Sequence, residues 1–278
     1  MDNGLSDEPR RIRNQAQYFI SIGRYERARS IISELISKYP EYPYAYYDMA
    51  VCEYYLGRID NSIELCYKSL ELGMRQVAVS IILMMLYNEK CDFAKVDNQY
   101  EVIKSLDPTN NDALAIYGYS LSQRGNEKEG IPLLEEAFKN DATNSIIIGY
   151  LFFATKKSRN KAQKEELLKL YMNSGASEKR KLLFAGKYNI HMKKWKNAKE
   201  CFARVIGMDP MNEEAIHYMK IIELKENLPK LIVMAAGWTV AIYITRFNCH
   251  ELRTYGFFMP ALMIFLLVAV LIYKLRRL

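Results

Sequence analysis

The sequence contains few of the residues that interrupt helices or build catalytic and metal centres. Its 278 residues include only 13 glycines and 8 prolines, whereas the helix-favouring Leu, Ala, Glu and Lys are common. None of the three histidines has a second potential ligand three or four residues later in the chain. The five cysteines form no CxxC pair, and phosphate-binding loops, nucleophile elbows and zinc-protease motifs are absent. We therefore expect a helical protein that is not an enzyme and uses no metal, cofactor or small-molecule substrate.

Two further absences narrow the class of protein. The first residues, MDNGLSDEPRR, are polar, so no cleavable signal peptide is expected. Cysteines within helical patterns behave as small apolar residues, which fits a reducing compartment. The formal net charge is +7, but the basic residues are scattered among acidic ones. Because nucleic-acid binding needs a basic stripe with base-stacking aromatics, we expect no nucleic-acid partner.

A period of 34 residues runs through most of the chain. Glycines and prolines recur at multiples of this spacing, at Gly23, Gly57 and Gly125 and at Pro40, Pro108 and Pro210. Both series place the repeat starts at Pro9, Pro43, Val77, Asn111, Ser145 and Lys179. The eighth residue of a repeat is often small, which lets two helices approach closely. The fifteenth is often glycine, which suits a left-handed turn between them.

At these positions, and at the repeat ends LISKYP, IKSLDP and VIGMDP, the sequence resembles the tetratricopeptide-repeat (TPR) family. The resemblance covers residues 9–227, after a flexible N-terminus at 1–8. It implies an all-α superhelical solenoid of about six helix-turn-helix repeats, with a capping helix after Pro210. It also implies a binding scaffold rather than a catalyst. The third repeat departs from the pattern at Met84 and Cys91, and the fifth at 155–164, where we expect an irregular basic turn.

The C-terminal part of the sequence is apolar enough to enter a membrane. Residues 257–273, FFMPALMIFLLVAVLIY, carry no charge and make about 26 Å of helix, close to a hydrocarbon core of roughly 30 Å. Residues 231–245 are a shorter apolar run between Lys230 and Arg246, whose side chains can extend towards the headgroups. The prediction is a transmembrane hairpin within 228–273, with helices at about 229–246 and 255–273, a loop at 247–254 and a basic tail at 274–278.

The charges near the hairpin predict its orientation. Two spans place Lys225, Lys230 and the basic tail on the same side as the repeats, which the positive-inside rule assigns to the cytoplasm. A single span would place the tail outside, against that rule. A hairpin buried in a soluble core or an oligomer is a further alternative. Surface helices, however, show one-sided patterning that these runs lack. We expect an integral membrane protein with a cytoplasmic TPR domain and tail.

The family resemblance also indicates which residues line the concave groove. In a TPR solenoid the first helix of each repeat faces inward near positions 2, 5, 9, 12 and 13. The predicted partner-binding groove comprises Arg13, Gln17, Tyr44, Tyr47, Val51, Tyr54, Tyr55, Ile81, Met85, Tyr119, Phe153 and Lys187. Its middle is aromatic and apolar and its ends are basic, a composition that suits an interface. The alternative is that these tyrosines pack between repeats.

The groove composition predicts a protein partner that supplies an apolar peptide or helix, with or without acidic flanks. One TPR subfamily grips a C-terminal carboxylate through Lys, Asn and Arg. The matching positions here include Asp48, which would repel a carboxylate, so no such clamp is expected. The leading functional prediction is a membrane-anchored adaptor that recruits a partner to the membrane. The alternatives are a structural subunit of a larger membrane complex, which contacts it through the hairpin, and a chaperone-like factor for secreted or membrane clients.

Overall fold

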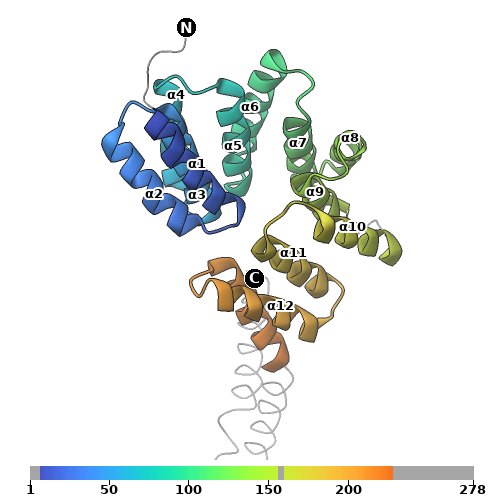
Figure 1. The fold of residues 1–278 in the computed structure, drawn as a ribbon. Coiled ribbons are helices and arrows are strands. Elements are labelled where there is room, and N and C mark those ends of the chain that lie inside the picture. The colour runs from blue at the N-terminus through green and yellow to red at the C-terminus, as the bar shows by residue number, and fades with distance from the viewer. Residues whose placement is uncertain (1–6, 156–159, 228–278) are drawn as a thin grey trace, which may run out of the picture. The chain divides into compact units, whose positions relative to one another are not determined.

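A computed structural model describes residues 7–155 and 160–227 (Figure 1). Helices account for all regular structure in these residues, and no strand occurs among them. The chain divides into two compact units, Met1–Asn212 and Glu213–Leu278. The first unit contains α1 (Asp7–Ser21), α2 (Tyr25–Lys38), α3 (Pro43–Tyr55), α4 (Ile59–Glu71), α5 (Gln76–Glu89), α6 (Phe93–Leu106), α7 (Asn111–Gln123), α8 (Glu127–Asn140), α9 (Ser145–Thr155), α10 (Lys161–Asn173), α11 (Glu178–His191) and α12 (Trp195–Met208).

These helices form successive pairs that follow the predicted 34-residue period. Helices α3, α7 and α9 begin at the predicted repeat starts, and α1, α5 and α11 begin within two residues of theirs. Each pair packs together, and each second helix of a pair packs against the first helix of the next (Figure 1). The prediction of an all-α TPR-like solenoid is therefore confirmed for the first unit.

The structure describes only part of the two ends of the predicted architecture. In the second unit, residues 213–227 form a helix at the expected position, and its capping role stays a prediction. Among the residues that the structure describes, no helix is long and apolar enough to cross a bilayer. The predicted spans at about 229–246 and 255–273, the loop 247–254 and the tail 274–278 lie outside the described residues, as does most of the predicted flexible N-terminus.

The turn inside the first four repeats and the sixth adopts the left-handed backbone that the glycine series predicted. The values of φ at Gly23, Gly57 and Gly125 are 76°, 78° and 88°. The same position is occupied by Cys91 and Lys193, which also take positive φ, at 55° and 57°. Because a side chain clashes with the backbone in this region, the two non-glycine turns are strained, yet the repeat geometry keeps them left-handed.

Close helix crossings explain why small residues recur in the repeat. A Cβ atom added to Gly118 would lie 2.7 Å from the carbonyl oxygen of Gly130, and one added to Gly130 would lie 2.4 Å from that of Gly118. Helices α7 and α8 thus meet backbone to backbone. The rule is not general in this chain, because the equivalent positions in the third and fifth repeats hold Met84 and Phe152. Both side chains are fully buried.

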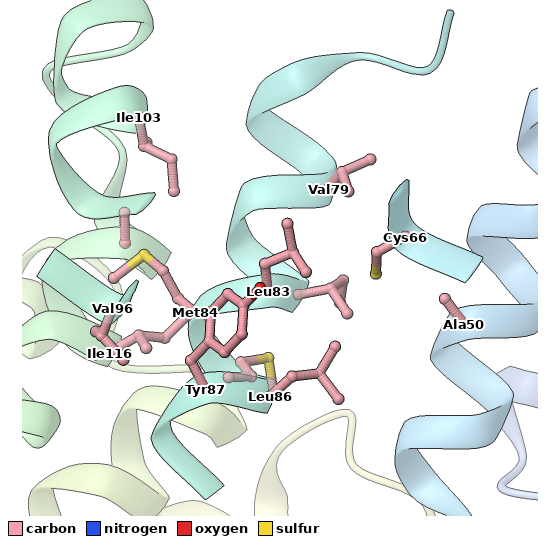
Figure 2. Packing of buried hydrophobic residues seen from close by; sticks show 13 residues of the cluster. Ala50, Cys66, Val79, Leu83, Met84, Leu86, Tyr87, Val96, Ile103 and Ile116 are labelled. Atoms are coloured by element: carbon pink, nitrogen blue, oxygen red, sulfur yellow. The ribbon is translucent and has the colours of Figure 1, made fainter. Parts of the chain in front are cut away.

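The largest hydrophobic cluster surrounds α5 (Figure 2). This helix is buried on nearly every face, because it consists mainly of large apolar residues after its first turn. Figure 2 shows Leu83 and Met84 of α5 among residues from neighbouring repeats, including Ala50 and Cys66 towards the N-terminus and Ile116 towards the C-terminus. Cys66 therefore serves as a small core residue, whereas Cys91 in the turn is exposed. Repeats two to four share one continuous core.

Candidate partner-binding groove

The predicted groove residues all lie on the first helices of the repeats, and all are at least partly buried. Several belong to two hydrophobic clusters rather than standing free of the core. Tyr47, Val51, Tyr54, Ile81 and Met85 pack in or against the cluster around α5. Tyr119 and Phe153 pack against the cluster of repeats four to six. The structure thus brings the middle of the groove together, with each aromatic side chain supported from behind by the core.

The basic N-terminal end of the groove is neutralised by the protein itself. Nε of Arg13 lies 2.7 Å from Oδ2 of Asp48, and Gln17 also donates a hydrogen bond to this carboxylate. The Arg13 guanidinium additionally lies 4.5 Å from the centre of the Tyr44 ring. Burial raises the pKa of the Asp48 carboxyl, although the hydrogen bonds from Arg13 and Gln17 oppose this change. Arg13, Gln17 and Tyr44 therefore form one internal network between the first two repeats.

Tyrosines from several repeats converge at the centre of the groove. The Tyr25 and Tyr55 rings stack with centres 4.6 Å apart, and the Tyr54 ring meets Tyr55 edge-on at 5.0 Å. Tyr119 stacks on Tyr150 at 4.5 Å. Burial raises the pKa of Tyr47 to about 12 and holds that of Tyr54 well above its usual value, so both hydroxyls stay protonated at neutral pH. The centre is an aromatic surface with polar, uncharged tips.

Arg180 reaches into this aromatic cluster from α11. Its guanidinium carbon lies 5.3 Å from the centre of the Tyr55 ring, and it donates a hydrogen bond to the Tyr171 hydroxyl. The side chain is largely buried, and its strongest electrostatic neighbours are Tyr55, Tyr171, Tyr25 and Tyr54. Sequence reasoning placed Arg180 at an inward-facing position of repeat six. The predicted set of groove residues does not include it. Its neighbours come from repeats one, two and five, which a pattern within one repeat does not reveal.

The sequence did not predict that side chains of the first repeat contact the start of α11. Nζ of Lys179 lies 4.9 Å from the centre of the Tyr25 ring, and a Cβ atom added to Gly23 would lie 3.0 Å from Oγ of Ser177. Farther along α11, Nζ of Lys187 lies 5.5 Å from the centre of the Phe153 ring. The first turn of α11 therefore contacts side chains of α2 and α3, so the predicted groove is lined from both ends of the repeat array.

Ring faces and hydroxyl groups are prominent among the groove side chains that the structure describes. No group of three or more His, Cys, Asp or Glu side chains that could hold a metal ion occurs among them. The buried thiols of Cys52 and Cys66 have their pKa raised to about 12 by burial, which makes them poor nucleophiles. The arrangement can hold another chain through ring faces, hydroxyl groups and one guanidinium.

Comparisons with known proteins agree with this architecture. Residues 14–42 match the family model described as tetratricopeptide repeat. The described helices form a solenoid with a TPR-like fold. Comparison of the sequence with curated proteins finds no match. The TPR match covers the second half of α1 and all of α2, together with the turn at Gly23, where the repeat pattern of the sequence is well kept.

Solved structures share the fold at low sequence identity. A tetratricopeptide repeat protein from Parabacteroides merdae is 12% identical with a TM-score of 0.56, and the match covers 80% of this chain and 87% of that one. A chain of the APC/C hetero-tetramer Cut9–Hcn1 is 13% identical with a TM-score of 0.53, over 77% of this chain and 42% of that one. PilW, a type IV pilus biogenesis factor, is 14% identical with a TM-score of 0.49, and the match covers 77% of this chain and 99% of that one. At such identities the first two of these likenesses show the fold alone, and no conclusion is drawn from the third.

Proposed function

We propose that this TPR solenoid is a membrane-anchored scaffold that binds a segment of a partner protein along its inner helices. The observation that carries the proposal is the convergence of aromatic side chains from different repeats, among them Tyr54, Tyr55 and Tyr119, on one inner surface. Tyrosine combines a large apolar face with a polar tip and loses little conformational entropy when it is fixed. Such a surface suits an extended or helical apolar segment of another protein.

The membrane part of the proposal rests on the apolar runs of the sequence. Residues 257–273 are long enough to span, and the shorter run before them allows a hairpin that returns the basic tail to the cytoplasm. Extraction of membranes with alkaline carbonate should leave the full-length protein in the pellet. In intact cells or organelles, added protease should reach the solenoid only from the cytoplasmic side. Release by carbonate would contradict the anchor.

The groove is tested by affinity purification from detergent-solubilised membranes. The wild type is compared with Tyr47→Ala/Tyr54→Ala, which removes two rings from the inner surface, and with Tyr67→Ala. Tyr67 lies on α4, is 45% exposed and shares a hydroxyl hydrogen bond with Tyr87, so its loss removes a tyrosine outside the groove. A stoichiometric protein should be retained by the wild type and Tyr67→Ala and lost from the double variant.

Two controls make this comparison decisive. Tyr47 and Tyr54 pack against the core cluster around α5, so thermal unfolding followed by circular dichroism must show that the double variant is folded at the assay temperature. An unchanged set of captured proteins in a folded double variant would refute the groove. The interaction would then lie in the predicted hairpin, as expected for a subunit of a larger membrane complex.

A further inference from the structure

Arg180 differs from Arg13 and Lys179 because no carboxylate among the described residues forms an ion pair with it. Arg13 is paired with Asp48 at 2.7 Å, and Lys179 with Asp209 at 3.0 Å. In the described part of the first unit, no carboxylate forms an ion pair with Arg180, and its neighbours are tyrosines. The guanidinium has five N–H donors, of which the Tyr171 hydroxyl accepts one.

Burying a charged group in this way is unfavourable without a counter-charge. The faces of aromatic rings offset part of the cost, and Arg180 lies 5.3 Å from the centre of the Tyr55 ring. A carboxylate offsets more of this cost than aromatic rings do, because two parallel N–H···O bonds to a guanidinium are short, strong and directional. The hydroxyls around Arg180, including those of Tyr54 and Tyr55, can donate further hydrogen bonds to the same anion. The cluster therefore offers donors and positive charge. An acid, the exposed Glu89, acts on Tyr54 and Tyr150, but the strongest electrostatic neighbours of Arg180 itself are tyrosines.

We propose that Arg180, surrounded by Tyr25, Tyr54, Tyr55 and Tyr171, binds a carboxylate side chain of the partner segment. The partner is accordingly an apolar peptide that carries an Asp or Glu, whose carboxylate reaches the guanidinium while its apolar neighbours contact the rings. This inference rests on the proposed function and names the chemistry of the partner. The site lies between the first two and the last two repeats, and Arg180 is outside the positions that match the carboxylate clamp of other TPR proteins.

The test uses the full-length protein in detergent micelles and two synthetic peptides. One is an acetylated, amidated peptide of about ten residues, roughly 33 Å when extended, that alternates Glu with Leu. The other replaces each Glu with Gln. Calorimetric titration is performed on the wild type, Arg180→Gln, Arg180→Lys and the control Arg204→Gln. Arg204 lies on α12, has a side chain 57% exposed and pairs with Glu178, so its change removes the same charge elsewhere.

A hydrogen-bonded, partly buried ion pair predicts that the wild type binds the Glu peptide about 10- to 100-fold more tightly than the Gln peptide. Arg180→Gln should abolish this preference, and Arg204→Gln should keep it. Arg180→Lys should keep part of it, because an ammonium retains the charge but not the planar pair of donors. Thermal unfolding establishes that each variant is folded, and Arg180→Lys provides the comparison if Arg180→Gln is not.

The proposal is overturned if the wild type binds both peptides equally or binds neither. It is also overturned if a folded Arg180→Gln variant keeps the preference. Equal binding of both peptides that is lost in Tyr47→Ala/Tyr54→Ala would leave the proposed groove intact and reject only the role of Arg180. The two hypotheses therefore fail in different ways.

Discussion

The backbone contact between α7 and α8 gives the most direct test of the fold, through the substitution Gly130→Ala. The added Cβ would lie 2.4 Å from the carbonyl oxygen of Gly118, 2.5 Å from Oγ of Ser122 and 2.9 Å from its backbone nitrogen. Two of these three atoms belong to the backbone, so the helices must move apart. Overpacking of this kind lowers the free energy of unfolding by about 1–3 kcal/mol or more. Replacing glycine by alanine within a helix raises it by about 1 kcal/mol, which offsets part of this loss.

We expect Gly130→Ala to lower the free energy of unfolding by about 1–2 kcal/mol, which corresponds to a fall in the unfolding temperature of roughly 2–8 °C for a domain of this size. The matched control is Gly207→Ala in the last turn of α12, where an added Cβ meets nothing within 4 Å. This change should raise stability by about 0.5–1 kcal/mol, because only the flexibility of the unfolded chain changes.

The assay is thermal unfolding of the full-length protein, followed by circular dichroism at a helical wavelength. Opposite signs for the two substitutions would support the close crossing of α7 and α8. If Gly130→Ala were neutral or stabilising, as Gly207→Ala is expected to be, the backbone contact between these helices would be refuted. The same result would also refute the packing register that places Gly118 opposite Gly130.

Three further predictions follow from other features of the solenoid. Cys91→Gly and Lys193→Gly should each raise the free energy of unfolding by up to about 1 kcal/mol, because both residues hold a left-handed backbone that glycine adopts without strain; lower midpoints in urea would contradict this. Asp48→Ala should lower the free energy of unfolding by about 3 kcal/mol, because it leaves the partly buried Arg13 without a carboxylate partner. In the same assay, the double change Asp48→Ala/Arg13→Ala should lower it by less than the sum of the two single changes. Burial raises the pKa of Tyr47 to about 12, so the neutral hydroxyl stabilises the fold below the unfolded pKa near 10, and this contribution is lost as the pH rises towards 12. Between pH 9 and 11, the free energy of unfolding of Tyr47→Phe should therefore fall by about 1 kcal/mol less than that of the wild type. If the free energies of both proteins fell in parallel with pH, a buried Tyr47 hydroxyl would be excluded.

The helix pairs were predictable because their signals are local. Glycine at Gly23 and Gly57 accepts the turn, Pro43 begins α3, and the spacing between such residues repeats along the chain. The inward-facing positions predicted from the same period all lie on first helices of the repeats, and their role in binding stays a prediction. The same reasoning also anticipated the alternative that tyrosines pack within the protein, which describes Tyr25 and Tyr55 well. Pattern reasoning was less accurate for the third and fifth repeats, where Met84 and Phe152 fill the core at positions expected to be small.

The sequence by itself therefore determined the helices of the first unit and their pairing order. Only the tertiary structure decided that Arg13 is neutralised by Asp48, and that Arg180 lies with Tyr25 and Tyr55 more than a hundred residues earlier in the chain. The reason is geometric. Every repeat adds a small rotation to the next, and packing at each interface sets its size. The sum of these rotations, which no local pattern encodes, brings the first turn of α11 to side chains of α2 and α3, at the proposed carboxylate site.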